Sequence, residues 1–408
     1  MTMTETAPIV PSVEDVSHDG ALRKQFLKVQ EALQTEIFER EAQIEGVLIS
    51  ALARQHYCEL GAPGLGKTFT ITRFFARLED VSTSQFLISR YTTDRHLFGP
   101  EDVLALAREG RQRRILTGRL ADSRFTLLDE LWEGRAVLIT THTALSERVY
   151  EQEGVNIPIP LRFGCAYVLS NHLPEDSFEA TYDRIPQRFV AKPLREPKNR
   201  RAMLKAKATG ALLPDPPKLL SDELITLAQQ QVANVDVPDL VLGTIDTTAN
   251  RLAEANITMS DRRLASIVAL VQATAWLAGR READVEDVNV MANVAWHDEE
   301  QIKETQKIVF ANCNPLWAEV AEMASSIGSL AADVAQAASE SDPGRRYNHS
   351  QKLRDRVVRA TEDLKNLSTK AAQKKANPKV QDKLTECRRV LISCTEQVLA
   401  ASKSATSQ

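Results

Sequence analysis

Residue types that could bind the phosphates of a nucleotide occur together in one segment, Gly61-Ala62-Pro63-Gly64-Leu65-Gly66-Lys67-Thr68-Phe69. The segment fits the pattern G-x-x-x-x-G-K-[ST], in which glycines allow backbone N–H groups to approach phosphate oxygens closely. Lys67 would add a positive charge near the β- and γ-phosphates, and the hydroxyl of Thr68 would coordinate Mg²⁺. A chance glycine-rich turn is the alternative, which a match to the complete pattern disfavours. We therefore predict that this segment binds ATP.

Two adjacent carboxylates, Asp129 and Glu130, end an apolar run that begins at Phe125. Strands often end in solvated charges, but a position about sixty residues after a phosphate loop is typical of nucleotide hydrolysis. Asp129 could hold Mg²⁺ through water, and Glu130 could be the general base that polarises the attacking water. Asn171, which follows another apolar run, could orient this water, and a turn-forming asparagine is the alternative.

The elements that must position these side chains are short apolar strands that alternate with helices. We expect strands at residues 56–60, 84–89, 124–130, 165–170 and 185–190. Apolar residues with helical spacing predict helices at residues 21–38, 42–54, 69–78, 101–109 and 138–148. We also expect a turn at residues 97–100 and a hairpin around Gly154 at residues 148–160. This alternation predicts an α/β fold, a parallel sheet with helices on both faces.

The chain becomes helical after the last expected strand. Ser260 is expected to cap a helix whose first turn contains Arg262 and Arg263. Arginine at the start of a helix opposes the helix dipole, so we expect another partner such as phosphate, with a solvated arginine pair as the alternative. The pattern predicts a flexible tail at 1–20, an αβα core at 21–195, a helical lid at 196–308 and a C-terminal domain at 309–408.

The C-terminal domain repeats apolar residues at alternating spacings of three and four. Three such runs, separated near Pro343 and Pro378, predict an antiparallel three-helix coiled-coil bundle. Residues 341–408 contain 15 Lys and Arg against 7 Asp and Glu, which gives a net charge of +8. A solvated basic face is one interpretation of this excess, and a docking surface for an acidic partner or for nucleic acid is the other.

Composition narrows the class of protein. The chain has 408 residues, of which 43% are hydrophobic, and a formal net charge of -4, so we expect two or three folded domains without a general affinity for nucleic acid. No apolar run reaches membrane-spanning length, and no signal pattern opens the chain. The five cysteines form no C-x-x-C pair, so we expect neither structural zinc nor disulfides, and a cytoplasmic location.

The order of these motifs resembles that of the AAA+ ATPases, more narrowly the MoxR group and its RavA type. The resemblance covers roughly residues 21–300 and rests on the segments Gly61–Thr68, Leu97–Pro100, Leu127–Trp132, Leu169–Glu175, Tyr182–Arg184 and Ser260–Arg263. It implies an αβα nucleotide-binding core, an all-helical lid, and a homo-hexameric ring with ATP and Mg²⁺ between its subunits.

The resemblance also implies roles for single residues. Asn171 corresponds to the first sensor, and Arg184 to the arginine finger that reaches the γ-phosphate of the neighbouring subunit. Arg262 corresponds to the second sensor in the lid, with Arg263 as the alternative and as a further nucleotide-binding residue. MoxR-type ATPases are described as remodelling protein substrates, often beside a partner with a von Willebrand A domain.

Three functions remain open at this point. A chaperone-like remodelling ATPase is the favoured one, and a DNA-translocating or helicase-class motor is the alternative because a similar hairpin occurs in such motors. The acidic hairpin tip, Glu151-Gln152-Glu153-Gly154, disfavours DNA, which would require Lys or Arg there. An intact Glu130 disfavours a scaffold that does not hydrolyse ATP. The C-terminal bundle lacks the β-rich module of RavA, so the partners of RavA are not carried over.

Overall fold

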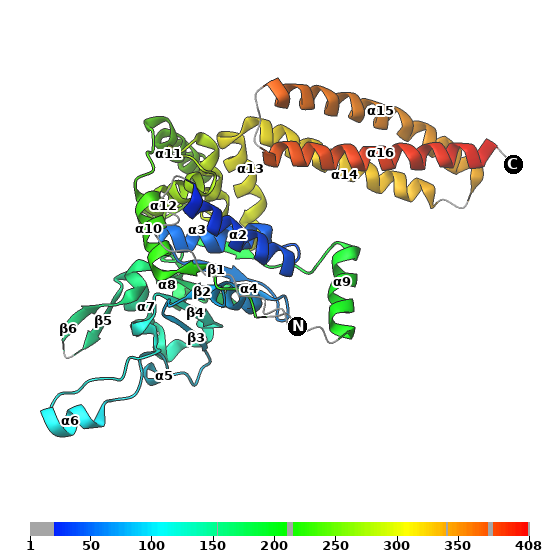
Figure 1. Cartoon of the computed structure of the whole chain (residues 1–408). Helices are drawn as coiled ribbons and strands as arrows, with labels where there is room; N and C mark the ends of the chain where they lie inside the picture. Colours follow the sequence, from blue (N-terminus) through cyan, green and yellow to red (C-terminus); the bar gives the residue numbers. More distant parts are fainter. Residues whose placement is uncertain (1–19, 153, 210–214, 340–341, 374–377, 407–408) are drawn as a thin grey trace, which may run out of the picture. The chain divides into compact units, whose positions relative to one another are not determined.

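The computed structural model describes residues 20–152, 154–209, 215–339, 342–373 and 378–406. The chain divides into two compact units, Met1–Gln306 and Lys307–Gln408. The first unit is built around a five-stranded parallel sheet (Figure 1). In spatial order its strands are β3 (Thr83–Leu87), β4 (Phe125–Asp129), β7 (Cys165–Ser170), β1 (Tyr57–Leu60) and β8 (Gln187–Val190). The α/β core predicted from the sequence is confirmed.

The register of the sheet brings the ends of its central strands to one edge. Leu60, the last residue of β1, pairs with Ser170 of β7 and with Val190 of β8. Asp129, the last residue of β4, pairs with Leu169 of β7. Because all these strands are parallel, the residues that follow β1, β4 and β7 meet at this carboxyl edge.

One face of the sheet is covered by α3 (Glu41–Ala53) and α4 (Lys67–Phe75). Phe74 of α4 packs edge-on against Phe125 and Tyr167, with ring centroids 6.1 and 5.9 Å apart. The hydroxyl of Tyr167 donates a hydrogen bond of 3.0 Å to a backbone carbonyl of α3. Aromatic side chains on the strands thus fix both helices on this face.

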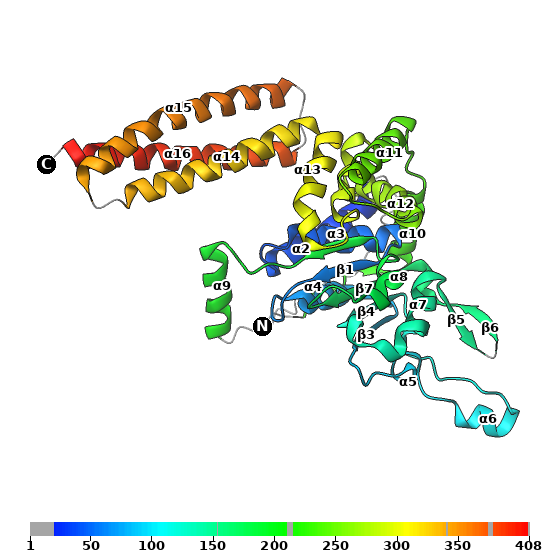
Figure 2. The same ribbon diagram turned by 180° about the vertical axis from the view of Figure 1, so that it is seen from behind.

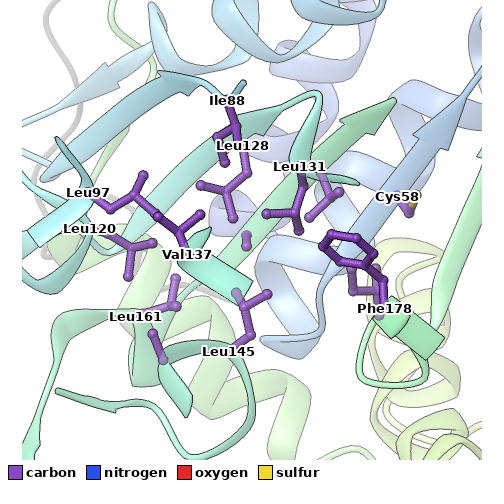
Figure 3. Close-up of a cluster of buried hydrophobic side chains, with 14 of the residues drawn as sticks. Cys58, Ile88, Leu97, Leu120, Leu128, Leu131, Val137, Leu145, Leu161 and Phe178 are labelled. Carbon is purple, nitrogen blue, oxygen red and sulfur yellow. The ribbon is translucent and has the colours of Figure 1, made fainter. Parts of the chain in front are cut away.

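The opposite face buries an apolar cluster against α7 (Leu138–Ser146) and α8 (Glu179–Tyr182). Cys58 of β1 and Leu128 of β4 contribute to this cluster, as does Leu145 of α7. Figure 3 shows these side chains gathered between the strands and the neighbouring helices. The sheet therefore carries helices on both faces, as the alternation of strands and helices predicted.

Two insertions extend from this core (Figure 1). Phe98 in the first and Tyr150 in the second stack with ring centroids 5.2 Å apart, which joins the bases of the two insertions. Gly99 has a φ of 88°, and a Cβ there would lie 2.0 Å from the carbonyl oxygen of Ile115, so only glycine fits where the first insertion returns. The insertions contain α5 (Asp94–Phe98) and α6 (Val103–Glu109), and the antiparallel strands β5 (Val149–Gln152) and β6 (Val155–Pro158).

Three of the expected boundaries that the structure corrects lie around the phosphate loop and the first insertion. Residues 97–100 are not all a turn, because the first two of them complete α5. The helix that follows the phosphate loop ends at Phe75 rather than at residue 78, because Leu78–Glu79 (β2) pairs with Leu220–Ser221 (β9). The helix expected from residue 101 begins at Val103. A local pattern cannot reveal a strand whose partner lies this far along the chain.

The predicted helical lid is confirmed in the remainder of the first unit. Phe26 of α2 (Ala21–Glu36) packs edge-to-face on Trp276, with ring centroids 5.4 Å apart. The hydroxyl of Ser260 accepts a hydrogen bond of 3.2 Å from the N–H of Arg263, so it caps its helix as expected. The lid contains α10 (Asp222–Ala233), α11 (Asp239–Glu254), α12 (Asp261–Leu277) and two 3-10 helices, η6 (Val285–Asn293) and η7 (Glu299–Gln301), and α13 (Ile302–Cys313) crosses the boundary between the units.

The second unit is the predicted antiparallel three-helix bundle, formed by α14 (Pro315–Ala338), α15 (Pro343–Gln373) and α16 (Pro378–Thr406). Proline at the first position of a helix is compatible with helical geometry, and the last two helices begin at the prolines that mark the breaks in the heptad pattern. Apolar residues at spacings of three and four fill the interior of the bundle, among them Val320, Leu364 and Leu391.

Candidate active site

The phosphate loop joins the carboxyl end of β1 to the N-terminus of α4. Gly61, Gly64 and Gly66 have φ values of 143°, 80° and 81°, which favour glycine. A Cβ at Gly61 would lie 2.8 Å from the carbonyl oxygen of Ala191, so the loop passes the end of β8 only because glycine is present. Among the described residues no side chain caps α4, so its first N–H groups are available to an anion.

Lys67 is buried, and its ammonium group lies among oxygen atoms at the carboxyl edge. It donates hydrogen bonds to the backbone carbonyls of Gly61 and Ala62, the latter at 3.2 Å. It also donates a hydrogen bond of 3.0 Å to the side-chain oxygen of Asn171. The candidate phosphate-binding lysine therefore contacts the candidate first sensor directly, because β1 and β7 are neighbours in the sheet.

Thr68 and Asp129, the candidate Mg²⁺ ligands, also lie together. The hydroxyl of Thr68 donates a hydrogen bond of 2.8 Å to Oδ2 of Asp129. A hydroxyl and a carboxylate supply the hard oxygen ligands that Mg²⁺ prefers. Phe69, the next residue of α4, is exposed, and its contact with nucleotide stays a prediction.

Glu130 adopts a left-handed backbone conformation, with a φ of 57°, directly after β4. Such a conformation costs on the order of 1 kcal/mol for a residue other than glycine and is common at functional sites. Its N–H donates a hydrogen bond of 2.8 Å to the carbonyl of Leu169, and its carboxylate accepts one of 3.2 Å from the N–H of Asn171. The candidate general base is thus held beside the candidate first sensor.

Two residues that support this site were missed in the sequence. Arg40 is buried and donates hydrogen bonds to the backbone carbonyls of Leu65 in the phosphate loop, at 3.2 Å, and of Lys192 after β8, at 2.6 Å. His172 contacts a neighbouring backbone carbonyl and the carboxylate of Glu133, and both acceptors raise the pKa of its imidazole. A single arginine or histidine carries no spacing signal, so neither role could be inferred.

The candidate arginine finger lies at the other edge of the sheet. Arg184 precedes β8, whose first residue, Gln187, pairs with Tyr57 at the start of β1. The phosphate loop follows the end of β1, so a strand of ~13 Å separates Arg184 from the phosphate loop of its own subunit. Within the described part of the chain, the Nε atom of Arg184 is buried and has no hydrogen-bond partner.

Arg184 lines a cleft of about 390 Å³ together with Asp183, Arg262 and Arg263. Arg262 is 58% exposed, and its guanidinium lies 3.8 Å from the carboxylate of Asp183. Burial lowers the pKa of Arg184, and the positive charge of Arg262 lowers it further. The carboxylate of Asp183 already offsets part of the repulsion between these two cations, and a bound phosphate would offset more of it.

A contact between Arg263 and nucleotide stays a prediction, and the structure disfavours it because this side chain turns into the lid. Its guanidinium donates hydrogen bonds to the carbonyls of Val294 and Ala295 at 2.7 and 2.6 Å, and burial lowers its pKa to about 9. Arg188, another arginine near the finger, is also buried and donates to the carbonyl of Trp296 at 2.7 Å. Arg262 is therefore the better candidate for the second sensor.

We expect substitutions of these adjacent arginines to separate stability from catalysis. Arg263→Ala would leave buried carbonyls without a donor and should lower the free energy of unfolding by about 2–4 kcal/mol. Arg262→Ala should change it by less than about 0.5 kcal/mol, because the side chain is exposed, while lowering the rate of ATP hydrolysis. Urea unfolding and an ATPase assay measure the two effects. Equal losses of stability in both variants would contradict these assignments.

The fold and the site together define an AAA+ ATPase. The family described as "MoxR domain in the MoxR-vWA-beta-propeller ternary systems" matches residues 24–228, and an AAA lid domain matches residues 241–309. The first match spans half of the chain, and the protein belongs to the MoxR group.

Relatives of the chain agree with this assignment. Two uncharacterized proteins of Methanocaldococcus jannaschii are 29% and 26% identical over 307 and 311 residues. These alignments cover 74% and 75% of this chain, and 78% and 81% of the relatives. The crystal structure of an inferred ATPase from Cytophaga hutchinsonii has a TM-score of 0.58 at 16% identity and covers 71% of this chain and 94% of its own. At this identity the structural similarity supports the fold alone.

In the part of the chain that the structure covers, no helix is both long enough and apolar enough to cross a bilayer. The location of the protein in the cell stays a prediction.

Proposed function

We propose that the protein hydrolyses ATP at the interfaces between subunits of a hexameric ring and uses this energy to remodel a partner protein. The observation that carries the proposal is the grouping of side chains at the carboxyl edge of the sheet. Lys67 and Glu130 both contact Asn171, and Thr68 contacts Asp129. These residues supply a cation for phosphate, ligands for a metal ion and a general base, which are the parts that phosphoryl transfer requires.

The residues present fit ATP with Mg²⁺. Thr68 and Asp129 would hold Mg²⁺, which when bound neutralises charge on the β- and γ-phosphates. Among the described residues, no group of three or more His, Cys, Asp or Glu could hold a metal ion. Mg²⁺ in sites of this kind is usually bound by one or two protein ligands together with substrate phosphates, and Thr68 and Asp129 would supply the protein ligands. Lys67 would bind the phosphates, and Glu130 would accept a proton from the attacking water.

The positions of the arginines support catalysis by two subunits. Arg184 and Arg262 line a cleft beside the residues that precede β1 and β8, at the edge opposite the phosphate loop. We infer that they act on ATP bound by the neighbouring subunit. In such a head-to-tail contact, the edge of the sheet that carries the phosphate loop (the loop edge) of one subunit meets the edge that carries Arg184 (the finger edge) of the next. Repeating this contact forms a closed ring when the rotation between neighbouring subunits adds up to a full turn.

Exposed apolar side chains on the two insertions favour a polypeptide over nucleic acid as the substrate. Val103 and Leu104 on α6 are 70% and 62% exposed, and Val155 on the hairpin is 62% exposed. Residues 149–158 contain no Lys or Arg, and Arg148 at the base of the hairpin donates hydrogen bonds to backbone carbonyls. Contact between the hairpin and a nucleic-acid backbone would require exposed cations there, so the hairpin favours a protein substrate over DNA, although Arg108 and Arg111 are exposed on the first insertion.

We further propose that the partner is a protein with a von Willebrand A domain, recruited by the three-helix bundle. The matching family is described by its occurrence with vWA and β-propeller components. The net charge of +8 over residues 341–408 supports an acidic docking surface on this partner.

Glu130→Gln is expected to retain a vWA-domain partner in the presence of ATP, because a subunit that binds ATP without hydrolysing it stays in the partner-bound state. The same variant in a chain that ends at Asn314, before α14, is expected to lose this partner while it still assembles. Affinity purification from cell extract with and without ATP, followed by mass spectrometry and a mass measurement of the ring, checks both results.

The matched control is Lys67→Ala, which should not retain the partner because it loses the cation that faces the phosphates. Identical sets of proteins bound to Glu130→Gln and Lys67→Ala would contradict ATP-dependent remodelling. A shortened chain that no longer assembles would show that the bundle belongs to the ring itself, and the partner site would then lie on the hairpin or the lid.

A further inference from the structure

Helix α9 (Pro197–Ala208) follows the last strand of the core and has no buried side chain among its described residues. In Figures 1 and 2 it stands apart from the sheet and from the lid helices of its own unit. A helix of 12 residues is only marginally stable in water unless it packs on another surface. The exposure of α9 therefore suggests that a surface outside its own subunit covers it.

The start of α9 is attached to the turn that supports the phosphate loop. The carboxylate of Glu39 accepts hydrogen bonds from the N–H groups of Arg195 and Glu196, at 2.7 and 3.0 Å, and from the side-chain amide of Asn199 at 3.0 Å. The next residue, Arg40, donates the hydrogen bond to the phosphate loop described above. These contacts hold α9 at the nucleotide-binding edge of the subunit.

The surface of α9 is basic and includes two exposed apolar side chains. Lys198, Arg201 and Lys205 recur at spacings of three and four, so they share one face of the helix. Arg200 and Lys207 bring the number of cations to five, and the helix contains no Asp or Glu. Met203 and Leu204 are 50% and 62% exposed. A basic face with apolar contacts is complementary to an acidic protein surface.

An acidic surface lies beside the arginine finger, at the opposite edge of the same unit. The hydroxyl of Tyr182, at the end of α8, donates a hydrogen bond of 3.1 Å to the carbonyl of His297. Residues 298–304 contain Asp298, Glu299, Glu300 and Glu304 against one cation, Lys303. The rings of Tyr182 and His297 also meet edge-on, with centroids 5.3 Å apart, so α8, which begins at Glu179, lies beside this segment.

We propose that α9 of one subunit docks on this acidic surface, residues 298–304 with Glu179, of the neighbouring subunit. The proposal rests on the proposed ring, in which the loop edge of one subunit meets the finger edge of the next. The basic helix and the acidic surface lie at these two edges, so a single head-to-tail contact joins them at every interface. The contact covers α9 and holds Arg184 of the second subunit near the phosphate loop of the first.

The double variant Arg201→Glu with Lys205→Glu tests this contact, because both changes keep good helix formers and reverse the charge of one face. It is expected to raise the protein concentration at which half of the rings form by at least ~10-fold in the presence of ATP. Glu299→Lys with Glu300→Lys is expected to have the same effect. Combining all four changes should restore assembly, because the charges are then exchanged across the interface. Mass photometry over a dilution series measures each result.

Lys24→Glu with Lys28→Glu on α2 is the matched control, since these exposed lysines have the same spacing. Rings of the α9 variant as stable as those of the wild type, or no recovery in the fourfold variant, would overturn the docking of α9 and leave the proposed function intact. A weakening in the α2 control equal to that in the α9 variant would also overturn it. A wild-type chain that stays monomeric with ATP at all concentrations would overturn the ring, and the docking with it.

Discussion

Glu130→Gln is expected to bind ATP with unchanged affinity and to hydrolyse it at least ~10²-fold more slowly, the usual scale for loss of a general base. The amide has nearly the shape of the carboxylate, so it can still accept the hydrogen bond from the N–H of Asn171. It cannot take a proton from water at neutral pH. Binding of a fluorescent ATP analogue and the rate of phosphate release measure the two parts of this result.

The control for Glu130→Gln is Lys67→Ala. This variant removes the ammonium group that the loop carbonyls and Asn171 surround, so it should lose ATP binding itself. The two variants together separate binding from chemistry. Turnover of Glu130→Gln at the wild-type rate would show that another group is the base, and the assignment would be abandoned.

Arg184→Ala is expected to lower the rate of ATP hydrolysis by roughly 10³-fold, the scale of an arginine finger, without weakening the affinity for ATP. The affinity for ATP should persist because Arg184 and the phosphate loop of the same subunit lie at opposite edges of the sheet. Arg184 precedes the start of β8, whereas the phosphate loop follows the end of β1. The affinity for ATP and the mass of the ring serve as internal controls. If isolated Arg184→Ala subunits lose affinity for ATP, the proposal that Arg184 acts on the ATP of the neighbouring subunit is contradicted.

Much of the candidate nucleotide site can be predicted from the sequence because its parts lie at strand ends. A glycine-rich loop after one apolar run, and Asp129 and Glu130 after another, must meet once the strands are parallel neighbours. The register places them as required, and the contacts of Lys67 with Asn171 and of Thr68 with Asp129 follow. The C-terminal bundle could also be predicted, because the heptad spacing of its apolar residues is a local pattern.

The remainder depends on contacts between distant parts of the chain. Arg262 and Arg263 occupy equivalent places in the sequence, yet the carbonyls of residues 294 and 295 turn one of them into the lid and leave the other exposed. The exposure of α9 is equally invisible in the sequence, because Lys, Arg, Met and Leu are as suitable for a buried amphipathic helix as for a free one. Such outcomes are set by tertiary packing rather than by local propensity.

Mixing two inactive variants tests most directly whether each ATP is hydrolysed by two subunits. Arg184→Ala subunits keep the phosphate loop, and Lys67→Ala subunits keep the finger. In random rings of equal parts, about a quarter of the interfaces combine an intact loop with an intact finger. ATP hydrolysis is expected to return to a fraction of this order on mixing, while each variant alone stays inactive. If the mixture forms rings but remains as inactive as its parents, Arg184 does not act on the neighbouring subunit, and the proposed interface is wrong.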